Sequence, residues 1–286
     1  MSRNTGFFRP ILGAASGLLL ALGALQAPAG AANFIETPMF RAAVRDGTMP
    51  PVYNRVPTEP SVVNLGGKKL IGLHGGDIKM LIGRARDVRL LVVYGYARLV
   101  GYNEQFEIEP DILKAVDSDD DRVFTLHLRE GHKWSDGAPF TSEDFRYWWD
   151  DVANNPNLSP SGPPIDMLVD GQPPLFEVID ETTVRYSWAS PNPSFLERLA
   201  GASPLFIYRP AHFLKTFHID HATPEQLETN AGGARSWAAR HNRVDNLYKF
   251  DNPDLPTLQP WMNVTRPPAN RFEAQRNPYY HRIDEK

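Results

Sequence analysis

Apolar and polar residues alternate most regularly along residues 123–129 (VFTLHLR). Phe124, Leu126 and Leu128 fall on one side of an extended chain, and the residues between them fall on the other. Strict alternation over this length is typical of a strand with one buried face and one solvated face. We therefore predict a strand here that packs against a core through its three large apolar side chains.

Turn and cap signals flank this strand. Aspartates crowd residues 117–121 before it, and short acidic side chains bond to local backbone amides in turns. Asp136-Gly137 predicts a second turn after it. Thr141 followed by Asp144 resembles a capping box, so we predict that a helix begins there. Nearby aromatic side chains are expected to pack in the core rather than to stack on a ligand: Trp134, Tyr147, Trp148 and Trp149.

Weaker patterns predict the remaining elements. Residues 89–96 are apolar on both faces, and periodicity alone leaves a buried strand and a helix open. Thr223-Pro224 predicts a helix with proline at its first position. The other predicted helices span residues 39–46, 195–200 and 235–248, and the other predicted strands span 69–73, 176–179, 183–188, 205–208, 258–264 and 271–276. This mixture indicates a mixed α/β fold.

The first 31 residues have the organisation of a secretory signal peptide. Arg3 and Arg9 precede an apolar stretch, residues 11–25, and Ala29-Gly30-Ala31 follows as a cleavage site. A membrane anchor is the alternative, but the stretch is shorter than the roughly 20 residues that span a bilayer. No cysteine follows it, which excludes a lipid-anchored lipoprotein. We expect a soluble protein exported to the periplasm of a Gram-negative cell.

Composition and charge narrow the possible partners. The chain has 286 residues, a formal net charge of −4 and no cysteine. The absence of cysteine removes disulfides and thiolate metal sites. The acidic balance disfavours nucleic acid and anionic membrane surfaces as partners, because both require basic patches.

Candidate catalytic and metal-binding motifs fail their own spacing requirements. The sequence contains no G-x-S-x-G nucleophile motif, no P-loop and no dinucleotide fingerprint. Residues 117–121, before the predicted strand of residues 123–129, begin like a calcium loop. Arg122 and Leu128, however, occupy the positions that require glycine and glutamate. His212, His218 and His221 are poorly spaced for zinc and are expected to be surface histidines near a loop. We predict no catalytic residue, no metal and no cofactor.

Several short runs follow one another in the order of a known family. They are Glu109-Pro110-Asp111, residues 124–129, Asp136-Gly137, Pro139-Phe140-Thr141 and Arg276-Asn277-Pro278-Tyr279-Tyr280. Their order resembles the extracellular solute-binding proteins of family 5, the periplasmic oligopeptide- and dipeptide-binding proteins of ABC importers. Two departures, Asp121-Arg122 at a turn and Ser135 in place of histidine, leave the resemblance intact. The family places a helix at residues 89–96.

The resemblance implies a bilobed fold of the periplasmic-binding-protein type II, cluster C. Residues 32–60 would form an N-terminal extension after the signal peptide of residues 1–31. Residues 61–93 and 191–286 would form a discontinuous, incomplete first lobe, and residues 94–190 would form an inserted extra domain. Members of the family are longer, so we expect the second ligand-binding lobe to be missing and the chain to be a truncated or split gene product.

The resemblance also implies a function. We expect the periplasmic substrate-binding component of an ABC importer, with a peptide as the solute, and not an enzyme. Its expected partners are this small solute and an ABC permease complex in the inner membrane, and the chain itself is expected to be a monomer. An oligosaccharide or another solute is the alternative within the family. Alternatives of another class are a periplasmic hydrolase and a chaperone or receptor partner.

One loop is the sequence's candidate for a ligand contact. His74, Gly75, Gly76 and Asp77 follow the predicted strand of residues 69–73, and ligands of α/β proteins bind beyond the carboxyl ends of strands. The two glycines would let backbone amides approach a ligand closely, and Asp77 would meet a ligand amine. An ordinary turn from strand to helix is the alternative.

Overall fold

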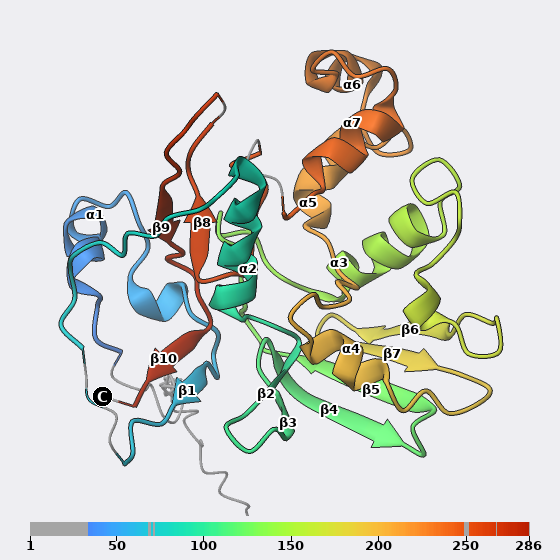
Figure 1. Cartoon of the computed structure of the whole chain (residues 1–286), viewed down its shortest axis with the longest axis horizontal. Coiled ribbons are helices and arrows are strands. Elements are labelled where there is room, and N and C mark those ends of the chain that lie inside the picture. The colour runs from blue at the N-terminus through green and yellow to red at the C-terminus, as the bar shows by residue number, and fades with distance from the viewer. Residues whose placement is uncertain (1–33, 68–69, 71, 249–251, 267, 286) are drawn as a thin grey trace, which may run out of the picture. The chain divides into compact units, whose positions relative to one another are not determined.

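A computed structural model of the chain describes residues 34–67, 70, 72–248, 252–266 and 268–285. The predicted signal peptide, residues 1–31, lies outside these described residues. Ile35–Lys286 group into one unit, and Figure 1 labels its helices and strands. Both kinds of element are present throughout this unit, so the predicted mixed α/β class is confirmed. Within the described ranges, no helix is long and apolar enough to cross a bilayer.

The largest sheet has four antiparallel strands in the order β4-β5-β7-β6 (Figure 1). Its strands are β4 (Leu113–Asp119), β5 (Val123–Leu128), β6 (Leu175–Asp180) and β7 (Thr183–Ser187). The central strand β5 pairs with β4 and β7, and its residues Phe124, Leu126 and Leu128 are buried. The alternation of residues 123–129 therefore predicted both the strand and its buried face correctly, and the β6–β7 hairpin is confirmed as well.

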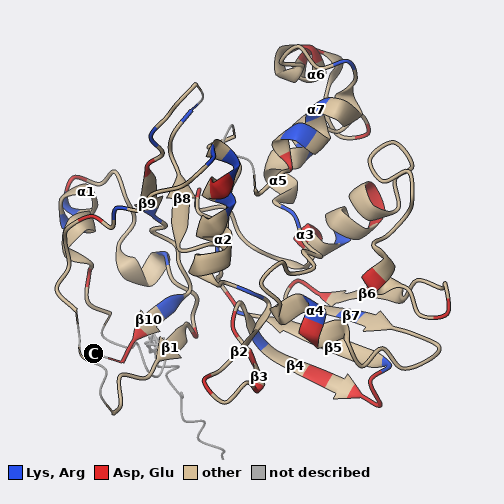
Figure 2. Ribbon diagram, in the orientation of Figure 1, with Lys and Arg blue, Asp and Glu red and all other residues tan. Residues whose placement is uncertain are grey.

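The tip of the β4–β5 hairpin is the predicted acidic turn. Figure 2 shows acidic residues gathered at this tip. Asp120 and Asp121 both adopt left-handed backbone conformations, with φ of 52° and 51°, which short polar residues tolerate better than most others. The Arg122 amide donates to the Asp119 carbonyl at 3.0 Å and closes the turn.

Two helices cover the buried face of this sheet. α4 (Phe195–Ala200) places the Phe195 ring 5.0 Å from that of Phe124 on β5. α3 (Ser142–Arg146) continues as a π-helix, Tyr147–Ala153, whose Trp149 ring lies 6.1 Å from that of Tyr186 on β7. Aromatic packing thus joins both helices to the sheet, and the predicted core role of the aromatic residues on α3 is confirmed.

α3 begins where the cap signal predicted. The Glu143 amide donates to the Thr141 hydroxyl at 3.3 Å, and the Thr141 amide donates to Asp144 Oδ2 at 3.0 Å. These reciprocal bonds satisfy backbone donors that the first turn of a helix otherwise leaves open. Asp144 does more than cap the helix, because its Oδ1 accepts from the Ala211 amide and its Oδ2 from the Trp134 indole.

The remaining strands form three small two-stranded sheets. β2 (Val100–Tyr102) pairs with β3 (Ile108–Pro110), and β8 (Trp261–Asn263) pairs with β9 (Ala274–Arg276), both antiparallel. β1 (Ser61–Val63) and β10 (Arg282–Asp284) pair in parallel. The β1–β10 pair joins segments more than 200 residues apart in the sequence, so a strand in the first part of the described chain pairs with one at its end. The predicted domain boundaries at residues 93–94 and 190–191 stay predictions.

Five further α-helices lie in the described part of the unit, together with short 3-10 turns. They are α1 (Arg41–Arg45), α2 (Leu90–Gly95), α5 (Ala211–Leu214), α6 (Pro224–Asn230) and α7 (Trp237–Val244). α2 resolves the alternative that periodicity left open for residues 89–96 in favour of a helix. The Gln226 amide donates to the Thr223 hydroxyl at 3.2 Å, so α6 has the predicted cap and begins with Pro224.

Two predicted strands are wrong. The described part of residues 69–73 has no strand, and Leu70 and Leu73 are fully or almost fully exposed because no neighbouring strand pairs with them. Residues 205–208 are extended and partly buried, but no strand lies beside them. The Leu205 amide donates to the Arg198 carbonyl at 2.9 Å, and the Arg209 amide donates to the Asp144 carbonyl at 3.0 Å. Their backbone bonds therefore go to helices rather than to a sheet.

A buried carboxylate ties the end of the described chain to its middle. Asp111 follows β3, and its Oδ1 accepts from His281 Nε2 and from Arg282 Nε, each at 2.7 Å. Its Oδ2 accepts from the Arg98 amide at 2.9 Å and from Arg282 Nη2 at 2.5 Å. All its lone-pair directions are thus used, and β10 is fixed beside the β2–β3 hairpin.

Candidate functional site

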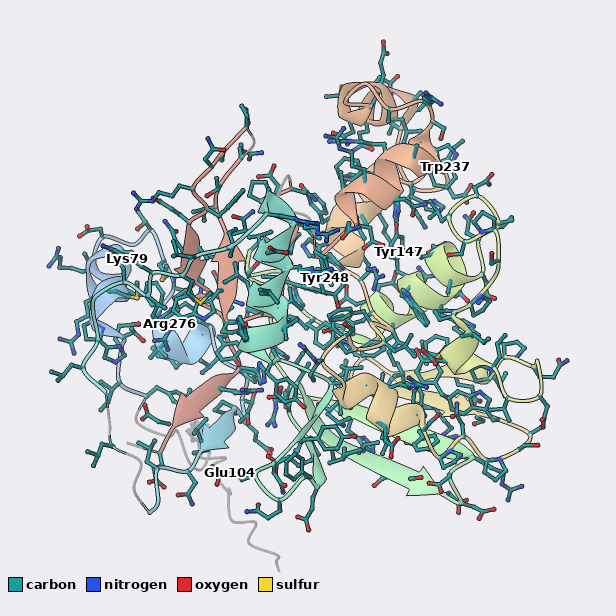
Figure 3. All side chains as sticks on the ribbon, viewed as in Figure 1. Lys79, Glu104, Tyr147, Trp237, Tyr248 and Arg276 are labelled. Atoms are coloured by element: carbon teal, nitrogen blue, oxygen red, sulfur yellow. The ribbon has the colours of Figure 1, made fainter. Side chains whose placement is uncertain are left out.

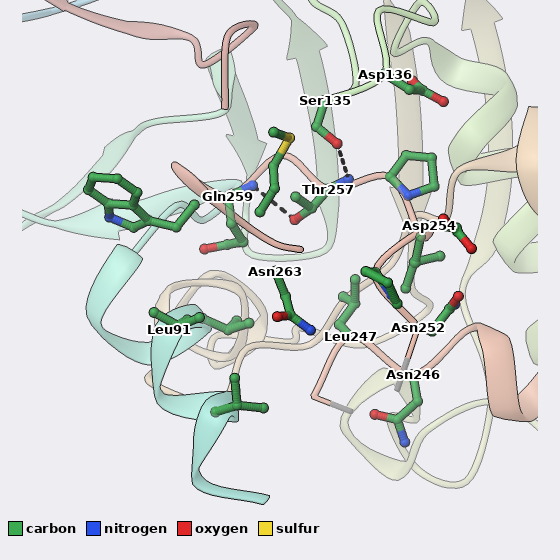
Figure 4. Close-up of a pocket in the computed structure, with 17 residues that line it drawn as sticks. Leu91, Ser135, Asp136, Asn246, Leu247, Asn252, Asp254, Thr257, Gln259 and Asn263 are labelled. Carbon is green, nitrogen blue, oxygen red and sulfur yellow. Dashed lines mark hydrogen bonds between the residues drawn. The ribbon is translucent and has the colours of Figure 1, made fainter. Parts of the chain in front are cut away.

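A cavity of about 220 Å³ opens between α2, the turn at Ser135-Asp136 and residues 246–247 and 252–263 (Figure 4). α2 and the 3-10 turn before it, Ala85–Arg89, supply an apolar wall through Val88, Leu91 and Val92. The rest of the lining mixes apolar and polar side chains. The apolar ones are Leu247, Pro253, Leu255, Pro256, Trp261 and Met262. The polar ones carry hydroxyl, amide or carboxylate groups: Ser135, Asp136, Asn246, Asn252, Asp254, Thr257, Gln259 and Asn263.

Hydrogen bonds hold one side of the cavity in a fixed arrangement. The Ser135 amide donates to the Thr257 carbonyl at 3.1 Å, and the Thr257 amide donates back to Ser135 Oγ at 3.0 Å. The Gln259 amide donates to Thr257 Oγ1 at 3.1 Å (Figure 4), and its side-chain amide donates to the Ala97 carbonyl at 3.0 Å. These polar groups are therefore positioned before any ligand arrives, which lowers the entropic cost of binding.

Two carboxylates at the cavity already have cationic or imidazole partners. Asp136 Oδ2 lies 2.7 Å from His212 Nε2 on α5, and Asp254 Oδ1 lies 2.5 Å from Arg266 Nη2. Burial raises the pKa of Asp136, but the hydrogen bonds from His212 and the Ala138 amide outweigh it, so the pKa lies below its ordinary value. Asp136 is therefore ionised at neutral pH and available as an acceptor.

One aromatic side chain, but no cationic one, belongs to the described lining of the cavity. The Trp261 side chain on β8 lines it and is 41% exposed. None of the described lining residues is lysine or arginine. The amides, hydroxyls and carboxylates of this mixed lining suit a ligand that carries many hydroxyl or amide groups, and its apolar side chains suit the apolar faces of such a ligand. It offers no direct cationic partner to a free carboxylate or phosphate, which arginine and lysine usually provide.

The loop predicted from the sequence lies elsewhere. His74, Gly75, Gly76 and Asp77 are all exposed and do not line the cavity. Gly75 and Gly76 have φ of 131° and 72°, conformations that glycine adopts at little cost. No other atom lies within 4 Å of the point where a Cβ would stand at either glycine. Both glycines thus leave open space beside the backbone, and a ligand role for this loop stays a prediction.

Sequence reasoning missed the cavity because its polar lining comes from an irregular segment. Residues 252–260 contain three prolines and no periodic pattern. A run of asparagine, aspartate and proline between predicted elements was the available signal, since such runs form ordered loops that often carry binding residues.

The prediction of surface histidines is wrong for one of the three residues. The side chains of His212 and His221 are 35% and 27% exposed, but that of His218 is completely buried. His218 packs against Trp237 of α7, which the sequence could not place beside it. Among the described residues, no group of three or more histidine, aspartate or glutamate side chains is arranged to hold a metal ion.

Comparison with known proteins identifies what this chain is similar to. The family model described as bacterial extracellular solute-binding proteins, family 5 Middle, matches residues 107–286. The periplasmic alpha-galactoside-binding protein of Rhizobium meliloti (strain 1021) is 28% identical over 263 residues, which are 85% of this chain and 35% of that protein. The periplasmic oligopeptide-binding protein OppA of Escherichia coli (strain K12) is 31% identical over 148 residues, 47% of this chain and 27% of that protein.

Solved structures agree with the match to family 5. A structure of oligopeptide-binding protein OppA superposes with a TM-score of 0.77 and 30% identity, and the match covers 88% of this chain and 39% of that chain. The periplasmic binding protein MelB from agrobacterium fabrum C58, in complex with stachyose, has the same fold, with a TM-score of 0.66 and 24% identity over 89% of this chain and 39% of that one. The chain thus spans well under half the length of these relatives.

Proposed function

Since this chain belongs to the bacterial extracellular solute-binding proteins of family 5, we propose that it serves ABC import as a solute-binding component. It binds a small solute reversibly and changes no covalent bond. The match of the family model to residues 107–286 carries this proposal. The preformed polar cavity beside α2 supports it, because binding proteins need fixed polar groups that orient a ligand.

The proposed route and mechanism follow from this role. The signal peptide of residues 1–31 takes the chain to the periplasm, where an ABC permease in the inner membrane is the partner. Residues 61–93 and 191–286 form the first lobe, and residues 94–190 form the insert. The β1–β10 pair supports this division because it joins the two parts of the first lobe, and the four-stranded sheet falls wholly within the insert. Closure of a second lobe over the solute would then give the form that docks on the permease.

The solute is proposed to be a peptide or, as second candidate, an oligosaccharide. The relatives and structures named OppA support a peptide. The cavity supports an oligosaccharide, because its hydroxyl, amide and carboxylate groups can bond to sugar hydroxyls and the exposed Trp261 indole offers an apolar face for a sugar ring. The relative that matches 85% of the chain is named an alpha-galactoside-binding protein.

Saturation-transfer NMR on purified residues 32–286 tests both candidates, since it detects binding with dissociation constants up to millimolar. Stachyose, raffinose, trialanine and trilysine are offered separately at millimolar concentration. Trp261→Ala is the matched variant, because this side chain lines the cavity and its removal leaves the buried core untouched.

The outcomes separate the candidates. Transfer to the two sugars that Trp261→Ala abolishes supports an oligosaccharide, and transfer to the tripeptides alone supports a peptide. Chemical conversion of any of these compounds during the experiment would contradict a binding role and favour the hydrolase alternative. No transfer to any of them would remove the cavity from the proposal.

A further inference from the structure

A buried group of imidazole rings lies between the π-helix Tyr147–Ala153 and the helical arm, by which we mean α5, α6 and α7 with their connections, residues 211–244. Figure 3 labels Tyr147 on the π-helix and Trp237 on α7. His218 follows α5, and His241 lies on α7. Both side chains are completely buried, as is Tyr147 on the π-helix. The His218 ring centroid lies 4.7 Å from that of Trp237 and 5.8 Å from that of His241. The arm therefore rests on the π-helix through titratable rings.

The contacts of His218 fit its neutral form. Its Nδ1 accepts from the Asp220 amide at 3.2 Å, and its Nε2 lies 3.2 Å from the Asp151 carbonyl, to which it donates. The Asn155 side-chain amide is 3.3 Å from the same Nε2. A second proton on Nδ1 would point at the Asp220 N–H, so protonation breaks this bond. The Asp220 carboxylate, 3.7 Å from Nδ1, is largely exposed and offsets only part of the loss.

His241 is even less able to hold a charge. Its Nε2 shares a hydrogen bond of 2.7 Å with the Tyr147 hydroxyl, and its buried Nδ1 has no hydrogen-bond partner. The positive charge of the Arg209 guanidinium, which pairs with Asp245 at 2.6 Å, also lowers the pKa of His241. Protonated His241 would therefore bury an unpaired positive charge close to another cation, which is costly.

The contact between the partly exposed side chains of His221 and Asp151 acts in the opposite direction, because it favours the protonated form of His221. His221 Nε2 lies 3.2 Å from Asp151 Oδ2, and protonation of His221 would strengthen this pair. Asp151 also pairs with Arg146 at 3.0 Å, so its charge is already partly neutralised. Because His221 is partly exposed, its gain is small compared with the loss at two fully buried rings.

The arm is also connected to the cavity. The Asn252 side-chain amide, which lines the cavity, donates to the Val244 carbonyl at the end of α7 at 2.6 Å. On α5, His212 Nε2 bonds to the cavity residue Asp136 at 2.7 Å. Movement of the arm would therefore displace two parts of the cavity lining.

We propose that His218 and His241 form a pH-sensitive latch, which holds the helical arm on the π-helix while both rings are neutral and releases it when they are protonated. Release would loosen the cavity as well. The latch depends on contacts within this chain alone and does not rest on the proposed solute-binding function.

The direction of the effect follows from the pKa values of the two rings. Burial lowers the pKa of His241 to about 3, helped by His218 and Arg209, and burial also lowers the pKa of His218 below 6.5. A base whose pKa is depressed in the folded state stabilises that state fully above its ordinary pKa. The stabilisation is then lost as the pH falls from 6.5 toward the folded value. Acid therefore opens the latch.

Hydrogen exchange on residues 32–286 tests the latch. Exchange is measured at about pH 7.5 and about pH 5 and corrected for intrinsic rates. The opening equilibrium of α7 should rise about 30-fold through His241, whose pKa of about 3 keeps it neutral in the closed state, and further through His218. Amides of β5 should change far less, because no ring of the latch contacts that strand. The latch is refuted if α7 opens no more than β5 does between the two pH values.

Matched variants locate the effect. Asn at position 218 supplies an acceptor near the place of Nδ1, and Gln at position 241 supplies one near the place of Nε2, yet neither titrates. We expect the double variant His218→Asn, His241→Gln to remove most of the pH dependence of α7, whereas the control His127→Gln on β5 should retain it. Equal pH dependence in the double variant and the wild type would overturn the assignment to these rings.

A second measurement covers the case in which the double variant fails to fold. The imidazole C–H resonances of the wild-type chain are followed by NMR as the pH falls. Titration of His218 and His241 below pH 6.5, together with loss of α7 protection, supports the latch. Titration of both rings at or above their ordinary pKa while α7 remains protected overturns it.

Discussion

Replacement of Asp111 by asparagine should destabilise the fold strongly while preserving the shape of the side chain. Asp111 is 6% exposed and accepts four hydrogen bonds, from His281, from Arg282 twice and from the Arg98 amide. Asparagine keeps one oxygen but turns an NH₂ group toward these donors. One of the two bonds from Arg282 is lost, the other goes to a neutral oxygen, and the buried His281 donor loses an anionic partner.

The magnitude can be worked from these contacts. Hydrogen bonds to charged groups contribute about 1.5–3 kcal/mol each, and removal of one partner of a buried ion pair costs about 3–5 kcal/mol. The Arg282 side chain is 27% exposed and can recover some hydration, so we take about 3 kcal/mol for Asp111→Asn. For a chain of this size, that loss corresponds to a fall in Tm of about 6–12 °C.

Urea unfolding at neutral pH, followed by far-UV circular dichroism, measures this loss. Asp117→Asn is the matched control, because the Asp117 carboxylate is 77% exposed and bonds to the His127 ring at the surface. The control should change the free energy of unfolding by less than about 0.5 kcal/mol. Our account of Asp111 is refuted if its variant unfolds within about 1 kcal/mol of the wild type.

The same pair of proteins should respond differently to acid. Burial raises the pKa of Asp111, but hydrogen bonds from His281 and Arg282 outweigh it and lower the pKa far below 3.8. The stability that Asp111 contributes is therefore full above pH 3.8 and is lost as the pH falls below that value. The difference in unfolding free energy between the wild type and Asp111→Asn should narrow below about pH 4. A difference that stays constant with pH would show that the charge of Asp111 does not stabilise the fold through His281 and Arg282.

Three further substitutions test local features. Gly137→Ala should lower the free energy of unfolding by about 1–3 kcal/mol, since Gly137 has φ of 91° and the added Cβ would lie 2.8 Å from Tyr279 Oη. Adding Tyr279→Phe to this variant should restore part of the lost stability in thermal unfolding, and no restoration would disprove the clash. Thr141→Ala should cost about 1 kcal/mol in urea unfolding, and Thr141→Ser much less, because only the hydroxyl caps α3. Arg98→Lys should lower the free energy of unfolding by about 2 kcal/mol, because the guanidinium donates to four carbonyls. A similar loss in the exposed control Arg122→Lys would show that these four hydrogen bonds are not the cause.

Sequence patterns predicted well where neighbouring residues decide the structure. Alternation predicted β5, and the cap signal at Thr141 predicted the start of α3, because both depend on contacts a few residues apart. The strands predicted at residues 69–73 and 205–208 failed because apolar content does not supply a neighbouring strand. The Leu205 amide bonds instead to the Arg198 carbonyl of α4, and the following Arg209 amide bonds to the Asp144 carbonyl of α3.

The candidate site and the buried polar groups show more clearly the contrast between features set by neighbouring residues and features set by distant ones. The run Glu109-Pro110-Asp111 helped to identify the family, yet nothing in it indicated that Asp111 would meet Arg282 at the far end of the described chain. The cavity gathers polar groups from a turn, a helix and an irregular segment, so no single stretch of sequence carries its pattern. His218 looked like a surface residue until α7 was placed over it.

By itself, then, the sequence determined the family, the mixed α/β class and most local elements, since these depend on short-range patterns of side chains. Only the tertiary structure decided which polar side chains are buried and which partners they have. The reason is physical: the protonation state and hydrogen bonding of a buried group depend on its surroundings in space, and those surroundings come from residues far away in the chain.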